Sequence, residues 1–175
     1  MSWFTILIGE QTEDTIAKLK KRHPARCGEH RGRGFSILYS FDSPTFSFAA
    51  DEHTSTLIAG LLISRSGDEY HILRSDEVTP SLGAEILLGT FEGQYAAVYI
   101  TNNKLTVIND RLGLRDVYYS RSSDAVFIST NPHYAASLLP INEIDTSAFG
   151  SRWLCFTQIG IRSLIKGVSR LLPGE

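Results

Sequence analysis

Residues 93–119 read GQYAAVYITNNKLTVINDRLGLRDVYY. Two runs rich in β-branched and aromatic residues flank Asn102-Asn103, and asparagine tolerates the positive φ of a tight hairpin turn. Gly113 allows a turn that a side chain would crowd, and Tyr118-Tyr119 then gives one ring to each face of the next strand. This stretch therefore predicts a block of antiparallel strands.

The rest of the chain carries the same kind of pattern. It predicts strands at residues 3–8, 35–41, 45–49, 56–63, 69–73, 94–101, 105–109, 117–121 and 125–130. It predicts helices at residues 12–22, 81–91, 131–139 and 145–154, the first capped by Thr12 and the last by Asp145. No repeat, low-complexity tract or linker interrupts this order. Residues 1–175 are therefore expected to form a single α+β domain with a sheet-on-sheet core and helices outside.

The composition excludes several classes of protein. The chain is 42% hydrophobic and 21% charged, which rules out disorder, collagen-like repeats and a coiled coil. The net charge of -2 is too near neutral for a surface that binds polyanions. Cys27 and Cys155 are too few for a disulfide scaffold, and no apolar run approaches the roughly 20 residues of a membrane span. A reduced, cytoplasmic protein with no membrane partner is expected.

Four sequence motifs occur in order at suitable distances: Gly93-Gln94-Tyr95-Ala96, Asn109 through Arg115, Val117-Tyr118-Tyr119, and Phe127-Ile128-Ser129. Together they resemble the glutaminase domain of asparagine synthetase-type class II glutamine amidotransferases. The resemblance implies a four-layer α/β/β/α sandwich of the N-terminal-nucleophile hydrolase type with antiparallel sheets. It also implies an ATP-dependent synthetase domain that follows in the same chain or acts in trans.

The resemblance further implies where a glutaminase would carry its nucleophile. In the family an N-terminal cysteine attacks glutamine while its own α-amino group acts as base. Here Ser2 stands in place of that cysteine, and bulky Trp3 stands where the family has glycine. Serine can serve as an N-terminal nucleophile, so the substitution alone does not abolish the chemistry.

The groups that would hold the substrate are changed as well. The family's oxyanion-binding Asn-Gly pair corresponds to Ala59-Gly60, which lacks the amide donor, and no arginine occurs near Asp51-Glu52-His53 to pair the substrate carboxylate. Asp76 matches the aspartate that binds the glutamine amino group, although a competing alignment places Gly83 there. Asp110, Arg111, Gly113, Tyr118 and Tyr119 are interpreted as scaffold or domain-contact residues.

These changes predict a catalytically degenerate glutaminase-like domain. The resemblance implies that such a domain belongs to an amide-forming system, of the β-lactam synthetase or lasso-peptide cyclase type. Glutaminase activity is not expected in this chain. No S-G-G-x-D-S phosphate loop occurs in it, so ATP and magnesium belong to the partner synthetase domain, and the chain itself is expected to hold no cofactor and no metal. A peptide or small carboxylate is the expected class of substrate.

Several alternatives stay open. The chain could be an active N-terminal-serine amidohydrolase that uses Ser2, or a peptide- or protein-binding module. His23, Cys27 and His30 have a spacing that could admit zinc, but no fourth ligand is evident. A basic stretch could meet a phosphate backbone, although nucleic acid is not the expected partner: Lys18, Lys20, Lys21, Arg22, Arg26, Arg31 and Arg33. Exposure of Trp153 and Phe156 would mark a docking surface.

Overall fold

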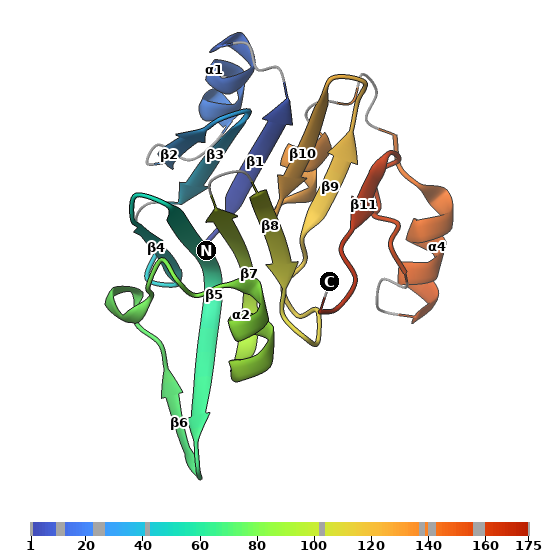
Figure 1. Cartoon of the computed structure of the whole chain (residues 1–175). Coiled ribbons are helices and arrows are strands. Elements are labelled where there is room, and N and C mark those ends of the chain that lie inside the picture. Colours follow the sequence, from blue (N-terminus) through green and yellow to red (C-terminus); the bar gives the residue numbers. More distant parts are fainter. Residues whose placement is uncertain are drawn as a thin grey trace. The chain divides into compact units, whose positions relative to one another are not determined.

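A computed structural model describes residues 2–9, 13–22, 27–40, 43–101, 104–136, 139, 143–155 and 160–174 of the chain (Figure 1). Contacts between Cα atoms divide it into two compact units. Unit 1 comprises Ser40–Asp116 together with Ser2, Pro173 and Gly174. Unit 2 comprises Trp3–Tyr39 and Val117–Leu172.

Unit 1 is built on one antiparallel sheet with the strand order β4-β5-β7-β8, and β6 adds to β5. Its elements are β4 (Phe46–Ala50), β5 (Thr54–Ser66), β6 (Glu69–Ile72), the short 3-10 helix η1 (Ser75–Glu77), α2 (Ala84–Thr90), β7 (Phe91–Thr101) and β8 (Lys104–Asn109). The long strand β5 pairs with β7 from Thr54 to Ser64, and its last residues pair only with β6. The β5–β6 hairpin therefore extends past the rest of the sheet (Figure 1).

One face of this sheet carries the core of unit 1. Alternate residues of the strands point to the same face, and those that meet α2 are apolar. The cluster consists of Ile58, Leu62, Val78, Leu87, Phe91, Tyr95, Ala97 and Ile108. Tyr95 is fully buried, and its hydroxyl donates a hydrogen bond to the Leu87 carbonyl at 2.8 Å. This bond satisfies the only polar atom of the tyrosine side chain and joins α2 to β7.

Unit 2 is built on a second antiparallel sheet with the order β11-β9-β10-β1-β3-β2. Its elements are β1 (Phe4–Gly9), α1 (Glu13–Arg22), β2 (Cys27–Gly32), β3 (Phe35–Ser40), β9 (Tyr118–Arg121), β10 (Ala125–Ser129), α3 (Pro132–Ala135), α4 (Thr146–Cys155) and β11 (Val168–Arg170). Strand β1 is central because its residues are almost all apolar and can be buried on both faces. Ile16 and Leu19 of α1 pack on Leu7, Leu38 and Phe127 of this sheet.

Most of the predicted strands are confirmed, as is the cap of the last helix, where the Asp145 carboxylate accepts the backbone N–H groups of Ser147 and Ala148. Strands β2 and β11 were missed because β2 is polar and β11 has only three residues. The third predicted helix is shorter, with α3 covering Pro132–Ala135. The proposed cap Thr12 and the turn at Asn102-Asn103 lie outside the described residues.

The prediction of a four-layer α/β/β/α sandwich of the N-terminal-nucleophile type is wrong. In the part of the chain that the structure describes, strand (48%) outweighs helix (21%), and the antiparallel strands form two sheets with few helices. The physical reason is helix length. Helices α2 and α3 have seven and four residues, and α1 and α4 have only ten each, so each spans about three turns or fewer and covers a small part of a sheet. Within the described ranges, no helix is both long and apolar enough to span a bilayer.

Candidate functional site

Ser2, which would be the nucleophile only if the chain were an active amidohydrolase, is buried in unit 1, with 1% of its surface exposed. Its hydroxyl oxygen accepts a hydrogen bond from the Thr45 hydroxyl, with 3.0 Å between the two oxygens. Its carbonyl accepts a hydrogen bond from the Arg115 guanidinium, and burial lowers the pKa of that guanidinium from its usual value. Both oxygen atoms of Ser2 are thus held by neighbouring residues.

Thr45 also accepts a hydrogen bond from the Gly60 backbone N–H. The Gly60 backbone N–H, which would bind an oxyanion in the resembling family, donates instead to the Thr45 carbonyl at 2.8 Å. Ala59, which stands where the resemblance places an asparagine, is fully buried and pairs with Phe46 and Ala96 in the sheet. The structure therefore brings Ser2 and Gly60 to the same residue, Thr45, whose backbone and side chain both take part in internal hydrogen bonds.

Gly60 has a structural reason to be glycine. Its φ is +132°, and a Cβ atom there would lie 2.1 Å from the Gln94 carbonyl oxygen and 2.7 Å from the Tyr95 Cα. Residues that carry a side chain rarely adopt this φ, and the β7 backbone fills the space that a side chain at position 60 would need. Glycine at this position therefore lets β5 and β7 lie close together, and no role in substrate binding is needed to explain it.

The other predicted substrate contacts do not gather around Ser2. Asp76 is exposed on η1, and none of the hydrogen bonds or ion pairs among the described residues joins it to Ser2 or Gly60. Gly83, its competitor in the alignment, immediately precedes α2. Near the place where the resemblance puts a carboxylate-binding arginine, Asp51 closes the β4–β5 turn by accepting the N–H groups of His53 and Thr54.

Asp110 is the best-formed polar centre of unit 1. It is 1% exposed, and its carboxylate accepts the backbone N–H groups of Leu112 at 3.1 Å, Leu114 at 2.9 Å and Arg115 at 2.8 Å. Its carbonyl accepts the N–H groups of Gly113 and Gly174. These bonds fix the loop after β8 from both ends, which supports the interpretation of Asp110 as a scaffold residue.

The remaining predicted scaffold residues fall into distinct places. Gly113 has φ +64° beside Pro173, as expected of a crowded turn. Arg111 is exposed, and no ion pair joins it to Asp110. In unit 2, Tyr118 is buried against Ala135, Ala136 and Val168, whereas its neighbour Tyr119 is partly exposed on the opposite face of β9.

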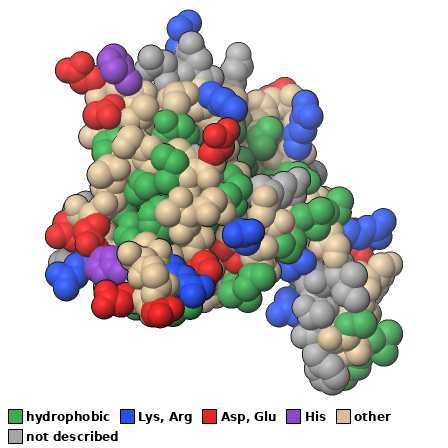
Figure 2. Space-filling view, turned by 60° about the horizontal axis from the view of Figure 1, so that its bottom comes forward, with side chains coloured by type: hydrophobic (Ala, Val, Ile, Leu, Met, Phe, Trp, Pro, Cys, Tyr) green, Lys and Arg blue, Asp and Glu red, His purple; other side chains and the backbone are tan. Residues whose placement is uncertain are grey.

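A feature that sequence reasoning missed lies beside the Asp110 loop. A hollow of about 700 Å³ opens between this loop and one face of β5 and β7. Its lining residues are Leu61, Ile63, Phe91, Glu92, Gly93, Gln94, Tyr95, Asp110, Arg111, Leu112 and Leu114. Figure 2 shows hydrophobic side chains at the surface among charged ones on the side of the molecule that it presents. The sequence signal for this hollow was the pair of leucines in a loop that otherwise carries polar residues and glycine.

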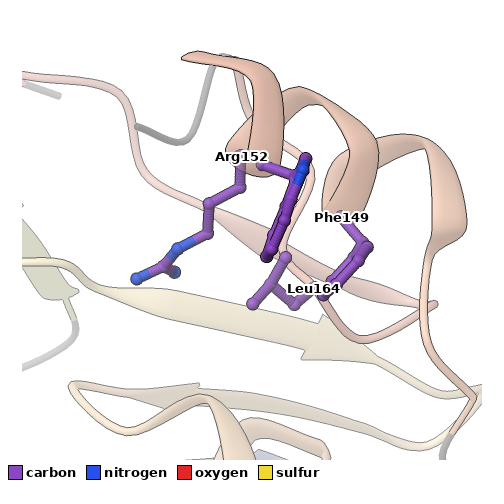
Figure 3. A pocket seen from close by; sticks show the side chains of 4 residues that line it. Phe149, Arg152 and Leu164 are labelled. Atoms are coloured by element: carbon purple, nitrogen blue, oxygen red, sulfur yellow. The ribbon is translucent and has the colours of Figure 1, made fainter. Parts of the chain in front are cut away.

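A second pocket, of about 460 Å³, lies on unit 2 beside α4 and is lined by Phe149, Arg152, Trp153 and Leu164. Figure 3 shows Phe149 and Leu164 close together under the helix, with Arg152 extending to one side. The ring of Trp153 stacks on that of Phe149 at 6.4 Å between centroids, and Trp153 is 72% exposed. Trp153 therefore meets the condition of exposure on which it would mark a docking surface, while Phe156 lies outside the described residues.

The cysteines, the possible zinc site and the basic stretch can also be placed in the structure. Cys27 and Cys155 are free thiols. Within the described residues, no cluster of three or more His, Cys, Asp or Glu side chains could hold a metal ion, and His23 of the proposed zinc set lies outside them. In the basic stretch, Glu29 pairs with Lys20 at 2.6 Å and with Arg31 at 2.5 Å. These pairs neutralise part of the positive charge.

A scan against protein-family models and a search of curated proteins found no match to this chain.

Proposed function

We propose that this chain is a catalytically degenerate, glutaminase-like domain that serves an ATP-dependent amide-forming synthetase, in the same protein or in trans. It would supply structure or part of a substrate surface, while the synthetase domain would bind ATP and magnesium. The resemblance of the Asp110–Tyr119 region to asparagine synthetase-type amidotransferases supports the kind of partner. The hydrogen bonds of Thr45 support the loss of hydrolysis.

The observation that carries the proposal is the double role of Thr45. A serine nucleophile needs an acceptor for its proton and donors for the oxyanion that forms when it attacks an amide. Here the Gly60 N–H is already bound to the Thr45 carbonyl, and Ala59 offers no second donor. Losing one oxyanion donor typically costs about 3 kcal/mol of activation free energy. Losing both, in a site that buries Ser2, leaves little hydrolysis to detect.

Hydrolysis is tested by measuring ammonia release from glutamine with the chain after removal of Met1. We expect no release above that of the Ser2→Ala variant. We also expect Ala59→Asn to restore none, because the Gly60 N–H stays bound to Thr45. Ammonia release that Ser2→Ala abolishes would contradict the proposal and favour an N-terminal-serine amidohydrolase.

The synthetase role needs a separate measurement. A synthetase of the asparagine synthetase type, the partner that the proposal requires, is assayed for pyrophosphate release from ATP, with and without the chain present. We expect the chain to increase the rate, and we expect Ser2→Ala to support the same increase as the unaltered chain. A synthetase whose rate does not respond to the chain would contradict this part of the proposal.

A further inference from the structure

The Asp110 loop holds two leucines out in solvent. Leu112 is 74% exposed and Leu114 is 56% exposed, although the N–H groups of both are fixed by the buried Asp110 carboxylate. Leucines in these positions contribute little to the stability of the fold, because most of their surface stays in water. A loop that is already ordered, however, loses little conformational entropy when a ligand covers it.

These leucines share the 700 Å³ hollow with further apolar side chains. Leu61 and Ile63 of β5 line it together with Leu112 and Leu114. Leu61 is itself 43% exposed. The volume falls within the range of about 300–1,000 Å³ that is typical of pockets for small ligands. A hollow of this size with several leucines exposed would be covered favourably by an apolar ligand.

Two opposite charges at the hollow lack partners among the described residues. Glu92 projects from β7 on the side that carries Ile63, and Arg111 belongs to the Asp110 loop. Neither makes an ion pair or a side-chain hydrogen bond with any residue in the part of the chain that the structure describes. Gln94 donates through Nε2 to the Leu114 carbonyl at 2.9 Å, which leaves its amide oxygen able to accept.

We propose that this hollow binds a short apolar peptide with opposite charges at its two ends. The apolar side chains would cover Leu61, Leu112 and Leu114, a carboxylate would pair with Arg111, and an ammonium group would pair with Glu92. The charges select this ligand over a neutral apolar molecule and over one of a single charge. This inference goes beyond the proposed function, since it requires neither ATP nor a synthetase.

The test is a calorimetric titration of the full chain with the tripeptide Leu-Leu-Leu. Matched ligands are its N-acetylated form, which lacks the ammonium group, and its C-terminal amide, which lacks the carboxylate. We expect saturable binding of the free tripeptide with one site per chain, and an affinity at least fivefold weaker for each blocked form. No saturable binding of the free tripeptide, or equal binding of all three peptides, would overturn the proposal.

Variants then assign the binding to the hollow. Leu112→Ser and Leu114→Ser are each expected to weaken binding about tenfold, since each removes apolar area that the ligand would cover. Arg111→Gln is expected to remove the advantage of the free tripeptide over its amide, and Glu92→Gln its advantage over the acetylated form. The control is Leu154→Ser on α4, where the leucine is 78% exposed and binding should be unchanged.

The mass of the chain in solution gives an independent check. Sedimentation is measured for the unaltered chain and for the Leu112→Ser variant. The variant should fold as the unaltered chain does, because the leucine is exposed. A dimer that dissociates in the variant would show that a second copy covers the hollow, and this result would overturn the peptide proposal. Unchanged tripeptide affinity in the leucine variants would overturn it as well.

Discussion

Replacing the buried Asp110 by alanine should destabilise the protein more than any comparable change of a surface carboxylate. The substitution removes the acceptor for the N–H groups of Leu112, Leu114 and Arg115. Its carboxylate is almost fully buried, so the remaining groups cannot all find water in the folded loop. The loop that connects β8 to the following strand would lose its internal support.

The magnitude follows from the three hydrogen bonds. A hydrogen bond to a charged group contributes about 1.5–3 kcal/mol net, although the partly exposed N–H groups of this loop would recover some solvation. We therefore expect Asp110→Ala to lower the free energy of unfolding by about 4 kcal/mol. Asp110→Asn can keep the two bonds that Oδ1 accepts but replaces the acceptor facing Arg115 N–H with a donor, so about 2 kcal/mol is expected.

The assay is equilibrium denaturation followed by far-ultraviolet circular dichroism, with ligand absent. Asp68→Asn is the matched control, because Asp68 is exposed in the turn between β5 and β6 and its replacement should change the unfolding free energy by less than about 0.5 kcal/mol. The reasoning is refuted if Asp110→Ala lies within about 1 kcal/mol of the unaltered protein. Equal losses for Asn and Ala would refute the account of the individual bonds.

Further outcomes follow from the core of unit 1. Gly60→Ala should lower the free energy of unfolding, measured by denaturation, by more than about 3 kcal/mol, because its Cβ would meet the β7 backbone at an unfavourable φ. Gly89 in α2 faces open space, so Gly89→Ala should raise the free energy of unfolding by about 0.5–1 kcal/mol. Leu87→Ala, at a fully buried position, should lower the free energy of unfolding by about 2–5 kcal/mol. Ile86→Ala, at the exposed neighbouring position, should lower it by less than about 1 kcal/mol. Equal effects of the two substitutions would contradict the packing described for α2. Burial raises the pKa of Tyr95 to about 12, so the folded state holds the phenol proton more tightly than the unfolded state does. The contribution of this protonated phenol to stability is complete below pH 10 and is lost as the pH rises towards 12. Unfolding measured at pH 9 and pH 11.5 should show a steeper loss for the unaltered protein than for Tyr95→Phe, and parallel losses would contradict burial of the phenol.

Local features of the fold could be predicted from the sequence because they depend on neighbouring residues. Alternation of apolar and polar residues placed most strands, and Gly113 and Asp145 marked a turn and a helix start that the structure contains. The edge strand β2 escaped prediction because its polar residues, such as Glu29 and His30, lack the pattern of a half-buried strand. The four-layer architecture failed because it was carried over from a resemblance, whereas helix length and sheet coverage depend on the whole fold.

The candidate sites divide in the same way. By itself the sequence shows that Ser2 and Ala59 stand where the resemblance to glutaminases places a cysteine and an asparagine, because residue identities can be read directly. Only the tertiary structure decided that Thr45 engages both Ser2 and Gly60, and that Leu112 and Leu114 stand exposed beside Glu92 and Arg111. Residue identity fixes which groups are present, but hydrogen-bond partners and exposure depend on contacts between segments far apart in the chain, which local patterns do not encode.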